Sequence, residues 1–327
     1  MRPEPVAFDY DHLTLVPRRA STLDHRGDAL PWVQFGPIRL AVPILGSPMP
    51  DVTGTDMARA LSNFGALGIL HRFQSIAQQL ADVSAIEQHS PSASVAAAVG
   101  VTGDWQERFS ALIARGCGII CVDTANGAHS QVGRAVAWMR TEAPGTFLIG
   151  GNVASAEAFR WLEDQGGDAI RVGIAGGAVC ETRTETGVYA PTPYAVAEAV
   201  GVRRQALIIG DSGIRTPSDM CKLLALGADV VMVGSALAGT REAPGRVIVV
   251  DEKKYKIMRG AASFSVQQQV GRDDPLYVEG AETLVPYKGK VSDVIERYLA
   301  GLRSSMSYMD ARTLEEYRAN VSVMLLR

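Results

Sequence analysis

The chain has 327 residues, of which 47% are hydrophobic and 20% are charged, and its formal net charge is −3. Positive and negative side chains are interspersed, so the sequence indicates no surface for nucleic acid or for a membrane. Its first residues lack the apolar core of a signal peptide, and no stretch has the ~18 apolar residues of a membrane-spanning helix. We expect a soluble, cytoplasmic α/β protein of two average domains or of one barrel with insertions.

The four cysteines, Cys117, Cys121, Cys180 and Cys221, form no CxxC pair and no zinc-binding spacing with the five histidines. Cys121 falls in an apolar strand pattern and Cys221 in a helical pattern, so both are expected to be buried. This cysteine usage favours a reducing compartment.

Short apolar runs alternate with amphipathic segments from Ala41 onward, after an arm (residues 1–40) with a short hairpin that turns at Gly36-Pro37. Nearly continuous apolar runs are typical of parallel strands buried on both faces. The predicted strands are 41–45, 68–71, 94–101, 118–123, 146–151, 168–173, 206–211 and 229–234.

Amphipathic helices are predicted between these strands, and local signals mark where they begin and end. Ser155 is an expected N-cap and Gly166 closes the same helix, while Thr216 caps the helix that Gly227 follows. Eight strands in strict alternation with helices favour a closed (β/α)8 barrel over a doubly wound open sheet. The active site is then expected on the loops that follow the strands. The predicted helices are 56–64, 75–89, 105–116, 130–143, 155–166, 192–201 and 216–227.

A long excursion follows the last strand, and we assign it to the same single domain, residues 1–327. It contains a predicted hairpin and then a polar segment without a core pattern. A loop of that length is usually functional or mobile, so we interpret residues 247–290 as a hairpin and mobile flap over the barrel mouth. A final helix, 291–309, and a tail, 313–327, end the chain.

Cys180 lies in a glycine-rich turn, GIAGGAVCETR, directly after the strand that ends at Val172. Glycines let the backbone approach a ligand closely. The thiolate is the reactive form of cysteine, and Arg171 and Arg183 are near enough in sequence to supply stabilising charge. A buried structural thiol is the alternative, but glycines and polar residues surround Cys180 where such a thiol has apolar neighbours. Cys180 is therefore the candidate nucleophile.

Motifs along the whole chain resemble, in order and spacing, the IMP dehydrogenase and GMP reductase family. This resemblance implies a (β/α)8 barrel, usually a homotetramer, that acts on C2 of a purine nucleotide through a cysteine-linked intermediate with a nicotinamide cofactor. The segments that carry it are 8–17, 43–72, 122–130, 150–158 (GGNVASAEA), 172–183 (VGIAGGAVCETR), 210–220 (GDSGIRTPSDM), 231–245 and 285–291 (VPYKGKV).

Three departures from the dehydrogenase pattern indicate the reductase branch. About twenty residues separate His71-Arg72-Phe73 from the third predicted strand, which leaves no room for the CBS domains that dehydrogenases commonly carry there. The flap has no adjacent Arg-Tyr pair between Ser263 and Gly280. The turn Ala125-Asn126-Gly127 also looks like the reductase version.

For a reductase, the resemblance implies that Cys180 attacks C2 of GMP, that ammonia leaves, and that NADPH delivers a hydride. For a dehydrogenase, it implies that NAD accepts the hydride. Thr182 and Glu279 would relay protons. Taken alone, Glu279 is also typical of a solvated carboxylate in a loop. A monovalent cation, potassium, is implied at Gly173, Ala175 and Cys180. Implied substrate-binding residues are Ser47, Met49, Asp211, Gly213, Gly234, Ser235, Arg259 and Gly260. Implied cofactor-binding residues are Asp123, Ala125, Asn126, Gly127 and Asn152.

Two positions at the implied phosphate site depart from the family pattern. Ala178 stands where the family has a serine, and Met258 where it has a tyrosine. Thr192 and Ser212 replace a familiar glutamine and glycine. Losing two charge-assisted hydrogen bonds of ~1.5–3 kcal/mol each would weaken nucleotide binding by roughly 10²–10⁴-fold if nothing replaces them. These departures indicate that the substrate need not be plain GMP, and a related purine nucleotide or nucleoside is the alternative.

Two rival functions stay open. An IMP dehydrogenase would add Cys180 to IMP and pass hydride to NAD, with Arg272 in the flap as a substitute base. A catalytically silent nucleotide sensor or partner subunit would keep the barrel without turnover. Retention of Cys180, Thr182 and Glu279 together argues against the sensor, since a sensor needs no nucleophile.

Overall fold

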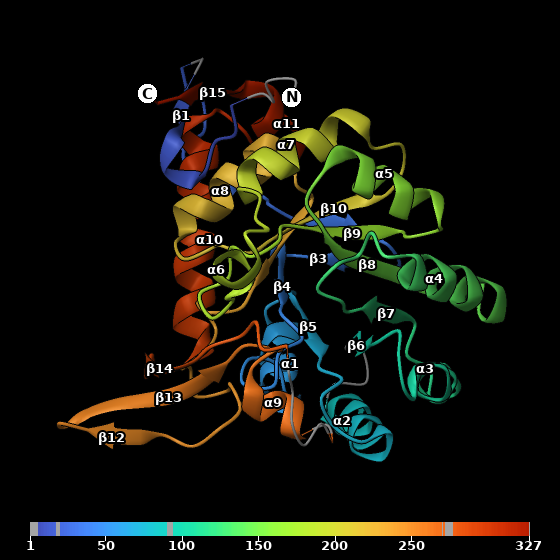
Figure 1. Ribbon diagram of the computed structural model, residues 1–327. Helices are drawn as coiled ribbons and strands as arrows, with labels where there is room; N and C mark the ends of the chain where they lie inside the picture. Colours follow the sequence, from blue (N-terminus) through green and yellow to red (C-terminus); the bar gives the residue numbers. More distant parts are fainter. Residues whose placement is uncertain (1–5, 18–19, 90–93, 270, 272–276, 327) are drawn as a thin grey trace.

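The computed structural model describes residues 6–17, 20–89, 94–269, 271 and 277–326, and a closed barrel of eight parallel strands lies at its centre (Figure 1). Every neighbouring pair of barrel strands is parallel. The predicted (β/α)8 barrel is confirmed, and the open sheet is excluded. In chain order the strands are β4 (Ile44–Gly46), β5 (Leu67–Leu70), β6 (Ala96–Val99), β7 (Ile119–Val122), β8 (Phe147–Val153), β9 (Ala169–Val172), β10 (Leu207–Asp211) and β11 (Val230–Val233).

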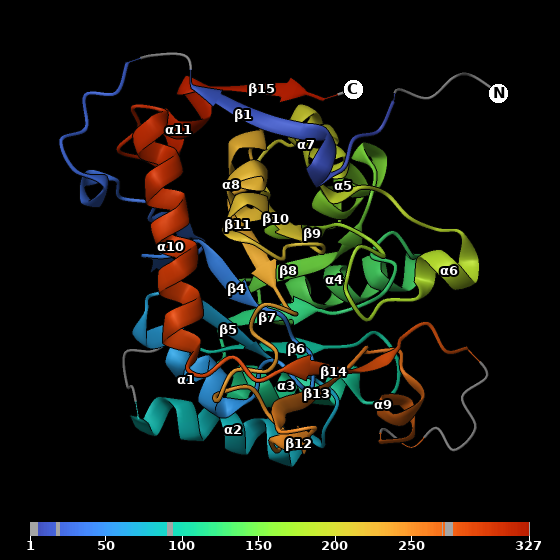
Figure 2. The same ribbon diagram turned by 90° about the vertical axis from the view of Figure 1, so that its left-hand side faces the viewer.

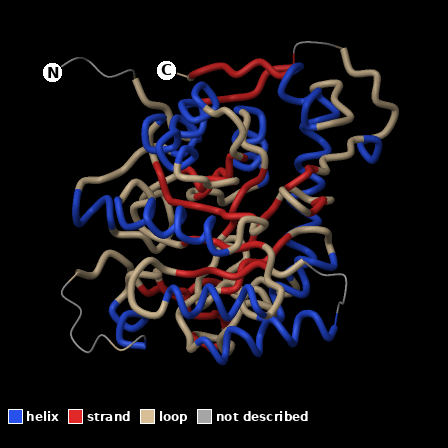
Figure 3. The backbone as a smooth tube through the Cα atoms, turned by 90° about the vertical axis from the view of Figure 1, so that its right-hand side faces the viewer, coloured by secondary structure: helices blue, strands red, loops and turns tan. Residues whose placement is uncertain are grey.

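Helices surround this barrel (Figure 3). The predicted caps are in place: Ser155 Oγ accepts from the Ala158 N–H, Thr216 Oγ1 accepts from the Asp219 N–H, and Gly227 closes its helix with φ 115°. The helices are α1 (Thr55–Asn63), α2 (Ile76–His89), α3 (Trp105–Ala114), α4 (Ser130–Glu142), α5 (Ala156–Asp164), α6 (Thr182–Thr186), α7 (Thr192–Val202), α8 (Pro217–Leu226) and α10 (Val291–Tyr308).

The predicted hairpin near the N-terminus closes one end of the barrel. Its strands, β2 (Val33–Phe35) and β3 (Ile38–Leu40), turn at Gly36, which has φ 55°. Phe35 is fully buried, belongs to the same apolar cluster as the side chains inside the barrel, and packs edge to face on Phe147 with 5.1 Å between ring centroids. Because side chains fill this end, a ligand reaches the barrel from the opposite end, where the strands terminate.

The two ends of the chain pair with each other, which the sequence did not predict. Strand β1 (Leu13–Pro17) runs antiparallel to β15 (Val321–Leu325), and the two lie side by side at one edge of the molecule (Figure 2). The arm also contains η1 (Tyr10–His12) and η2 (Arg26–Asp28), and α11 (Leu314–Asn320) precedes β15. These strands join segments distant in sequence, so no local pattern announces them.

The excursion after β11 begins with the predicted hairpin, β12 (Ile248–Val250) and β13 (Lys253–Arg259), which projects from the body of the molecule (Figure 1). A third strand, β14 (Glu282–Pro286), pairs with β13, and a short helix, α9 (Phe264–Gln269), interrupts the segment that had no core pattern. Residues 270 and 272–276 of the predicted mobile flap, including Arg272, lie outside the described residues.

Candidate active site

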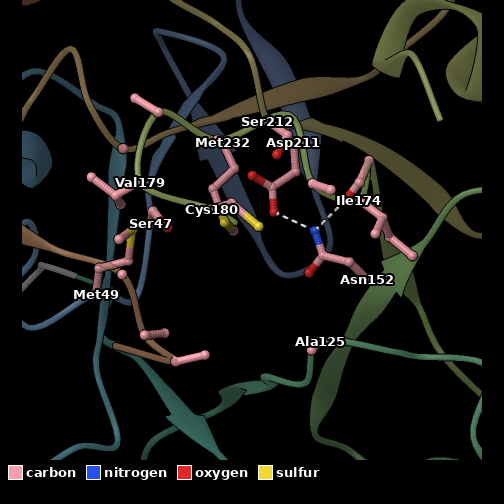
Figure 4. Close-up of a pocket in the computed structure, with 18 of the residues that line it drawn as sticks. Ser47, Met49, Ala125, Asn152, Ile174, Val179, Cys180, Asp211, Ser212 and Met232 are labelled. Carbon is pink, nitrogen blue, oxygen red and sulfur yellow. Dashed lines mark hydrogen bonds between the residues drawn. The ribbon is translucent and has the colours of Figure 1, made fainter. Parts of the chain in front are cut away.

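A cavity of about 280 Å³ opens at the end of the barrel where the strands terminate (Figure 4). It is lined by residues from the loops after β4, β5, β7, β9, β10 and β11, by Asn152 of β8, and by the excursion that follows β11. The lining includes most of the residues singled out from the sequence: Ser47, Met49, Asp123, Ala125, Asn152, Gly173, Ala175, Cys180, Thr182, Asp211, Gly213, Gly234, Ser235, Gly260 and Glu279.

Cys180, Thr182 and Glu279 form a chain of hydrogen bonds at this cavity. Cys180 Sγ lies 3.4 Å from Thr182 Oγ1, and Thr182 Oγ1 donates to Glu279 Oε2 at 2.6 Å. Thr182 is the first residue of α6, whereas Glu279 comes from the far end of the flap. The arrangement connects a half-buried thiol through one hydroxyl to a carboxylate, a path along which a proton can move.

Three backbone segments meet beside the thiol, and glycines make the close approach possible. The Glu181 N–H donates to Glu279 O, and the Ala281 N–H donates to Val179 O, both at 2.9 Å. A Cβ at Gly280 would lie 2.6 Å from Ser263 N, and one at Gly260 would lie 2.7 Å from Val179 O. These contacts leave no space for a larger residue at Gly260 or Gly280, and they dock the end of the flap on the Cys180 loop.

Arg171 joins two carboxylates that line the cavity. Its Nη1 donates to Asp123 Oδ1 at 2.6 Å, its Nε donates to Asp211 Oδ2 at 2.9 Å, and its side chain is only 8% exposed. Burial alone would raise the pKa of Asp123, but the cations of Arg171 and Arg72 hold it below its usual value. Asp123 is therefore a carboxylate at neutral pH.

Asn152 fixes the second carboxylate, because its Nδ2 donates to Asp211 Oδ2 and to Gly173 O, each at 2.8 Å (Figure 4). No described residue donates to Asp211 Oδ1. Since Asp211 borders the cavity, this oxygen is the acceptor that a hydroxyl-bearing ligand would find.

The corner beside Gly234 has apolar walls. The nearest atoms to a Cβ built at Gly234 are Met49 Sδ at 3.6 Å, Ser47 Cβ at 3.7 Å and Met258 Cε at 4.0 Å. Arg259, which the resemblance placed with the substrate, does not line the cavity: its guanidinium forms a bidentate pair with Asp51 at 2.7 and 2.8 Å.

Asn126 and Gly127, expected on the cofactor side, do not border the cavity in the described part of the chain. The Gly127 N–H donates to Asn152 O at 2.7 Å, so this turn supports the cavity wall from behind. Arg183 stacks on Tyr189, with 4.3 Å between Cζ and the ring centroid. Arg171 and Arg183 thus engage other groups, and neither forms an ion pair or hydrogen bond with Cys180 among the described contacts.

A monovalent cation at Gly173, Ala175 and Cys180 stays a prediction. The Gly173 carbonyl already accepts the Asn152 side-chain amide at 2.8 Å, and Ala175 holds a positive φ of 62°. We derive no step through such an ion.

The other three cysteines are buried, as predicted for Cys121 and Cys221. Burial raises the pKa of Cys117 and of Cys121 to about 12, and that of Cys221 to about 11. Of the four thiols, which all lie in the described part of the chain, only Cys180 lines this cavity.

The whole chain matches one protein family: residues 7–326 align with the IMP dehydrogenase / GMP reductase domain. The chain belongs to this family. A GMP reductase of Chromobacterium violaceum is 35% identical over 322 residues, which is 98% of both chains. Within the described residues, no helix is long and apolar enough to cross a membrane.

Inosine-5'-monophosphate dehydrogenases of the same family match over a shorter stretch. The protein of Streptococcus pyogenes is 41% identical over 238 residues, and that of Aquifex aeolicus 40% over 232 residues. Our chain spans about half the length of these relatives, 48% and 47% respectively.

Proposed function

We propose that this member of the IMP dehydrogenase / GMP reductase family is a GMP reductase-like oxidoreductase that converts GMP, or a closely related purine nucleotide, to IMP and ammonia. The observation that carries the proposal is the hydrogen-bonded chain from Cys180 through Thr182 to Glu279. The full-length similarity to a GMP reductase supports the same branch.

In the proposed reaction the Cys180 thiolate forms a bond to C2 of the purine. The C2–N bond to the amino group then breaks, and a proton delivered along Thr182 and Glu279 lets that group leave as ammonia. NADPH, when bound, supplies a hydride to C2 of the resulting thioimidate. The C2–S bond breaks last, which returns the electron pair to Cys180 and releases IMP.

Substrate and cofactor would occupy different parts of the cavity. Asp211 Oδ1 would accept a ribose hydroxyl, and the backbone amides of Gly213, Gly234 and Ser235 would receive the phosphate. Ser47 and Met49 would pack on the base. Asp123, Ala125 and Asn152 would border the nicotinamide, and Ala125 lies well away from Asp211 across the cavity (Figure 4).

A dehydrogenase reaction, IMP to XMP with NAD, is the second candidate, because identity to the dehydrogenases is higher over the shared stretch. The same relay would serve it. The flap sequence lacks the adjacent Arg-Tyr pair that the dehydrogenase branch carries, which favours the reductase.

The test incubates purified protein with GMP and NADPH, and separately with IMP and NAD, and follows absorbance at the reduced-nicotinamide band together with intact-protein mass. We expect NADPH consumption with ammonia release, and a mass adduct on the wild type that Cys180→Ala lacks. Cys221→Ala is the matched control, since it removes a buried thiol outside the cavity.

NADH formation from IMP would identify a dehydrogenase instead. Binding of nucleotide without turnover in either direction would identify a nucleotide sensor or partner subunit. The homotetramer implied by the resemblance stays part of the proposal, and light scattering on the eluted protein tests it.

A further inference from the structure

Tyr10, in the N-terminal arm, reaches the loop that follows β10 from outside the cavity. Its hydroxyl donates to Ser212 O at 2.7 Å, and its side chain is buried. The ring lies against Gly213, because a Cβ there would be 2.7 Å from Tyr10 Cε2. Lys222 Nζ in turn donates to Tyr10 O at 2.8 Å, which holds the arm against α8.

The hydrogen bond to Ser212 sets the direction of the next N–H. Ser212 O and the Gly213 N–H belong to one peptide unit, and the cis bond of the described chain is elsewhere, at Gly151-Asn152. In a trans peptide the C=O and N–H point in opposite directions. Since Tyr10 holds the carbonyl on the outer side and Gly213 borders the cavity, the Gly213 N–H points inward. It donates to no acceptor among the described residues.

The backbone conformation of Ser212 is unfavourable in itself, so this peptide orientation needs a stabilising contact. Its φ of 94° lies in the region that favours glycine, and a side chain there costs about 1 kcal/mol or more. The Tyr10 hydroxyl contacts the carbonyl of that same residue. A bond to the carbonyl also polarises the peptide and strengthens its N–H as a donor.

The same arm also holds the loop that carries the nucleophile. Asp9 accepts a hydrogen bond from the Tyr189 hydroxyl, and Tyr189 lies at the end of the Cys180 loop, under the Arg183 side chain. One short segment of the arm thus contacts both loops that border the substrate end of the cavity.

We propose that Tyr10 is a positioning residue that aims the Gly213 N–H at an anionic group of the substrate. The inference rests on the proposed function, which places a nucleotide phosphate at this amide. Tyr10 does not line the cavity itself, and it acts through Ser212 and Gly213, which do. The contact with the anion is the same in the bound substrate and in the transition state, so its loss should raise KM and leave kcat nearly unchanged.

The test compares Tyr10→Phe with the wild type for binding of IMP and of inosine, which differ only in the 5′-phosphate, by isothermal titration. We expect the dissociation constant of IMP to rise about tenfold, since hydrogen bonds to charged groups contribute more than neutral ones, and that of inosine to change less than twofold. Tyr317→Phe is the matched control: it removes another buried hydroxyl, which contacts Ser305 and lies outside the cavity. It should leave both ligands unaffected.

A purely structural role for Tyr10 would weaken IMP and inosine equally, and that result overturns the proposal, as does unchanged IMP binding. If the wild type binds neither ligand, the proposed function fails and the positioning role fails with it. Lys222→Met provides a second variant if Tyr10→Phe does not fold, because it loosens the arm and keeps the hydroxyl. It should produce a smaller loss that is again selective for IMP.

Discussion

Two sets of side chains in the cavity are held in different ways. In the first set, which we call the strand network, Arg171 pairs with both Asp123 and Asp211, and Asn152 donates to Asp211. These residues stand on or directly after barrel strands, whose ladders fix their positions. In the second set, the relay, single hydrogen bonds join Cys180, Thr182 and Glu279, which belong to a loop, a short helix and the flap.

This difference fits the two tasks that a cysteine-dependent site has to perform. A group that orients a ligand works best when its own partners hold it rigidly. A nucleophile and its proton relay must exchange partners during the reaction, so a sparsely bonded arrangement on loops suits them. The network on the strands is therefore expected to govern stability and binding, and the relay to govern turnover.

The largest expected difference is between Cys180 and Cys121, in their rates of reaction with a thiol reagent. Cys121 Sγ lies 3.7 Å from Arg171 Nη1 of the strand network, and burial raises the pKa of Cys121 to about 12. At pH 8 only about one such thiol in 10⁴ is ionised, and it is inaccessible. We expect iodoacetamide to modify native protein at Cys180 over a thousandfold faster than at Cys121, by peptide mass mapping. Equal labelling of the two would contradict the contrast, and denatured protein should react at all four cysteines.

Arg171→Met tests the strand network. The change leaves two buried carboxylates without their main cation, and breaking a buried pair in this way costs about 3–5 kcal/mol of unfolding free energy. Denaturant unfolding measures it. Arg59→Met is the control, because its partner Asp56 is 75% exposed and the pair should contribute less than about 0.5 kcal/mol.

The pH dependence sharpens this test. In the wild type the folded pKa of Asp123 lies below its unfolded value, so the carboxylate stabilises the fold above about pH 4, and that stabilisation is lost as the pH falls through the folded value. In the variant Arg72 still lies 3.4 Å from Asp123, but burial outweighs this one cation and raises the pKa of Asp123 above its unfolded value. The carboxylate then destabilises the fold as the pH rises. The difference in stability between wild type and variant should narrow from pH 7.5 to pH 5. A constant difference would show that the charge of Arg171 is not what stabilises the network.

Glu279→Gln tests the relay. The amide keeps the shape of the side chain but cannot carry the proton, so kcat should fall by roughly 10²-fold or more, the usual range for general acid–base groups, with stability nearly unchanged. Steady-state kinetics and thermal denaturation together check this. Glu282→Gln, on exposed β14, should retain wild-type kcat. A loss of stability as large as that of Arg171→Met would mean that the relay is structural.

The sequence predicts the barrel and the nucleophile of the relay, but not the contacts of the strand network. The barrel was predictable, because each strand is a continuous apolar run and caps such as Ser155 and Thr216 are local signals. Cys180 stood out through its glycine-rich turn. The partners of Arg171 and Arg259 were not predictable, since an arginine looks the same in sequence whether it faces a ligand or a buried carboxylate. Tyr10 and the β1–β15 pair depend on contacts between distant segments.

Ala178→Ser is expected to have the smallest effect. It adds a hydroxyl to the Cys180 loop at the position where the family pattern has a serine. Ala178 is exposed and lines the cavity, so a hydroxyl fits there without displacing other side chains. One added hydrogen bond of about 1 kcal/mol should tighten IMP binding roughly fivefold and leave inosine binding unchanged. Isothermal titration with both ligands distinguishes the outcomes. Tighter IMP binding would mean that this loop, and not only the amides after β10 and β11, meets the phosphate. Unchanged binding would mean that the anion is held entirely on the β10 and β11 side, where Tyr10 orients Gly213.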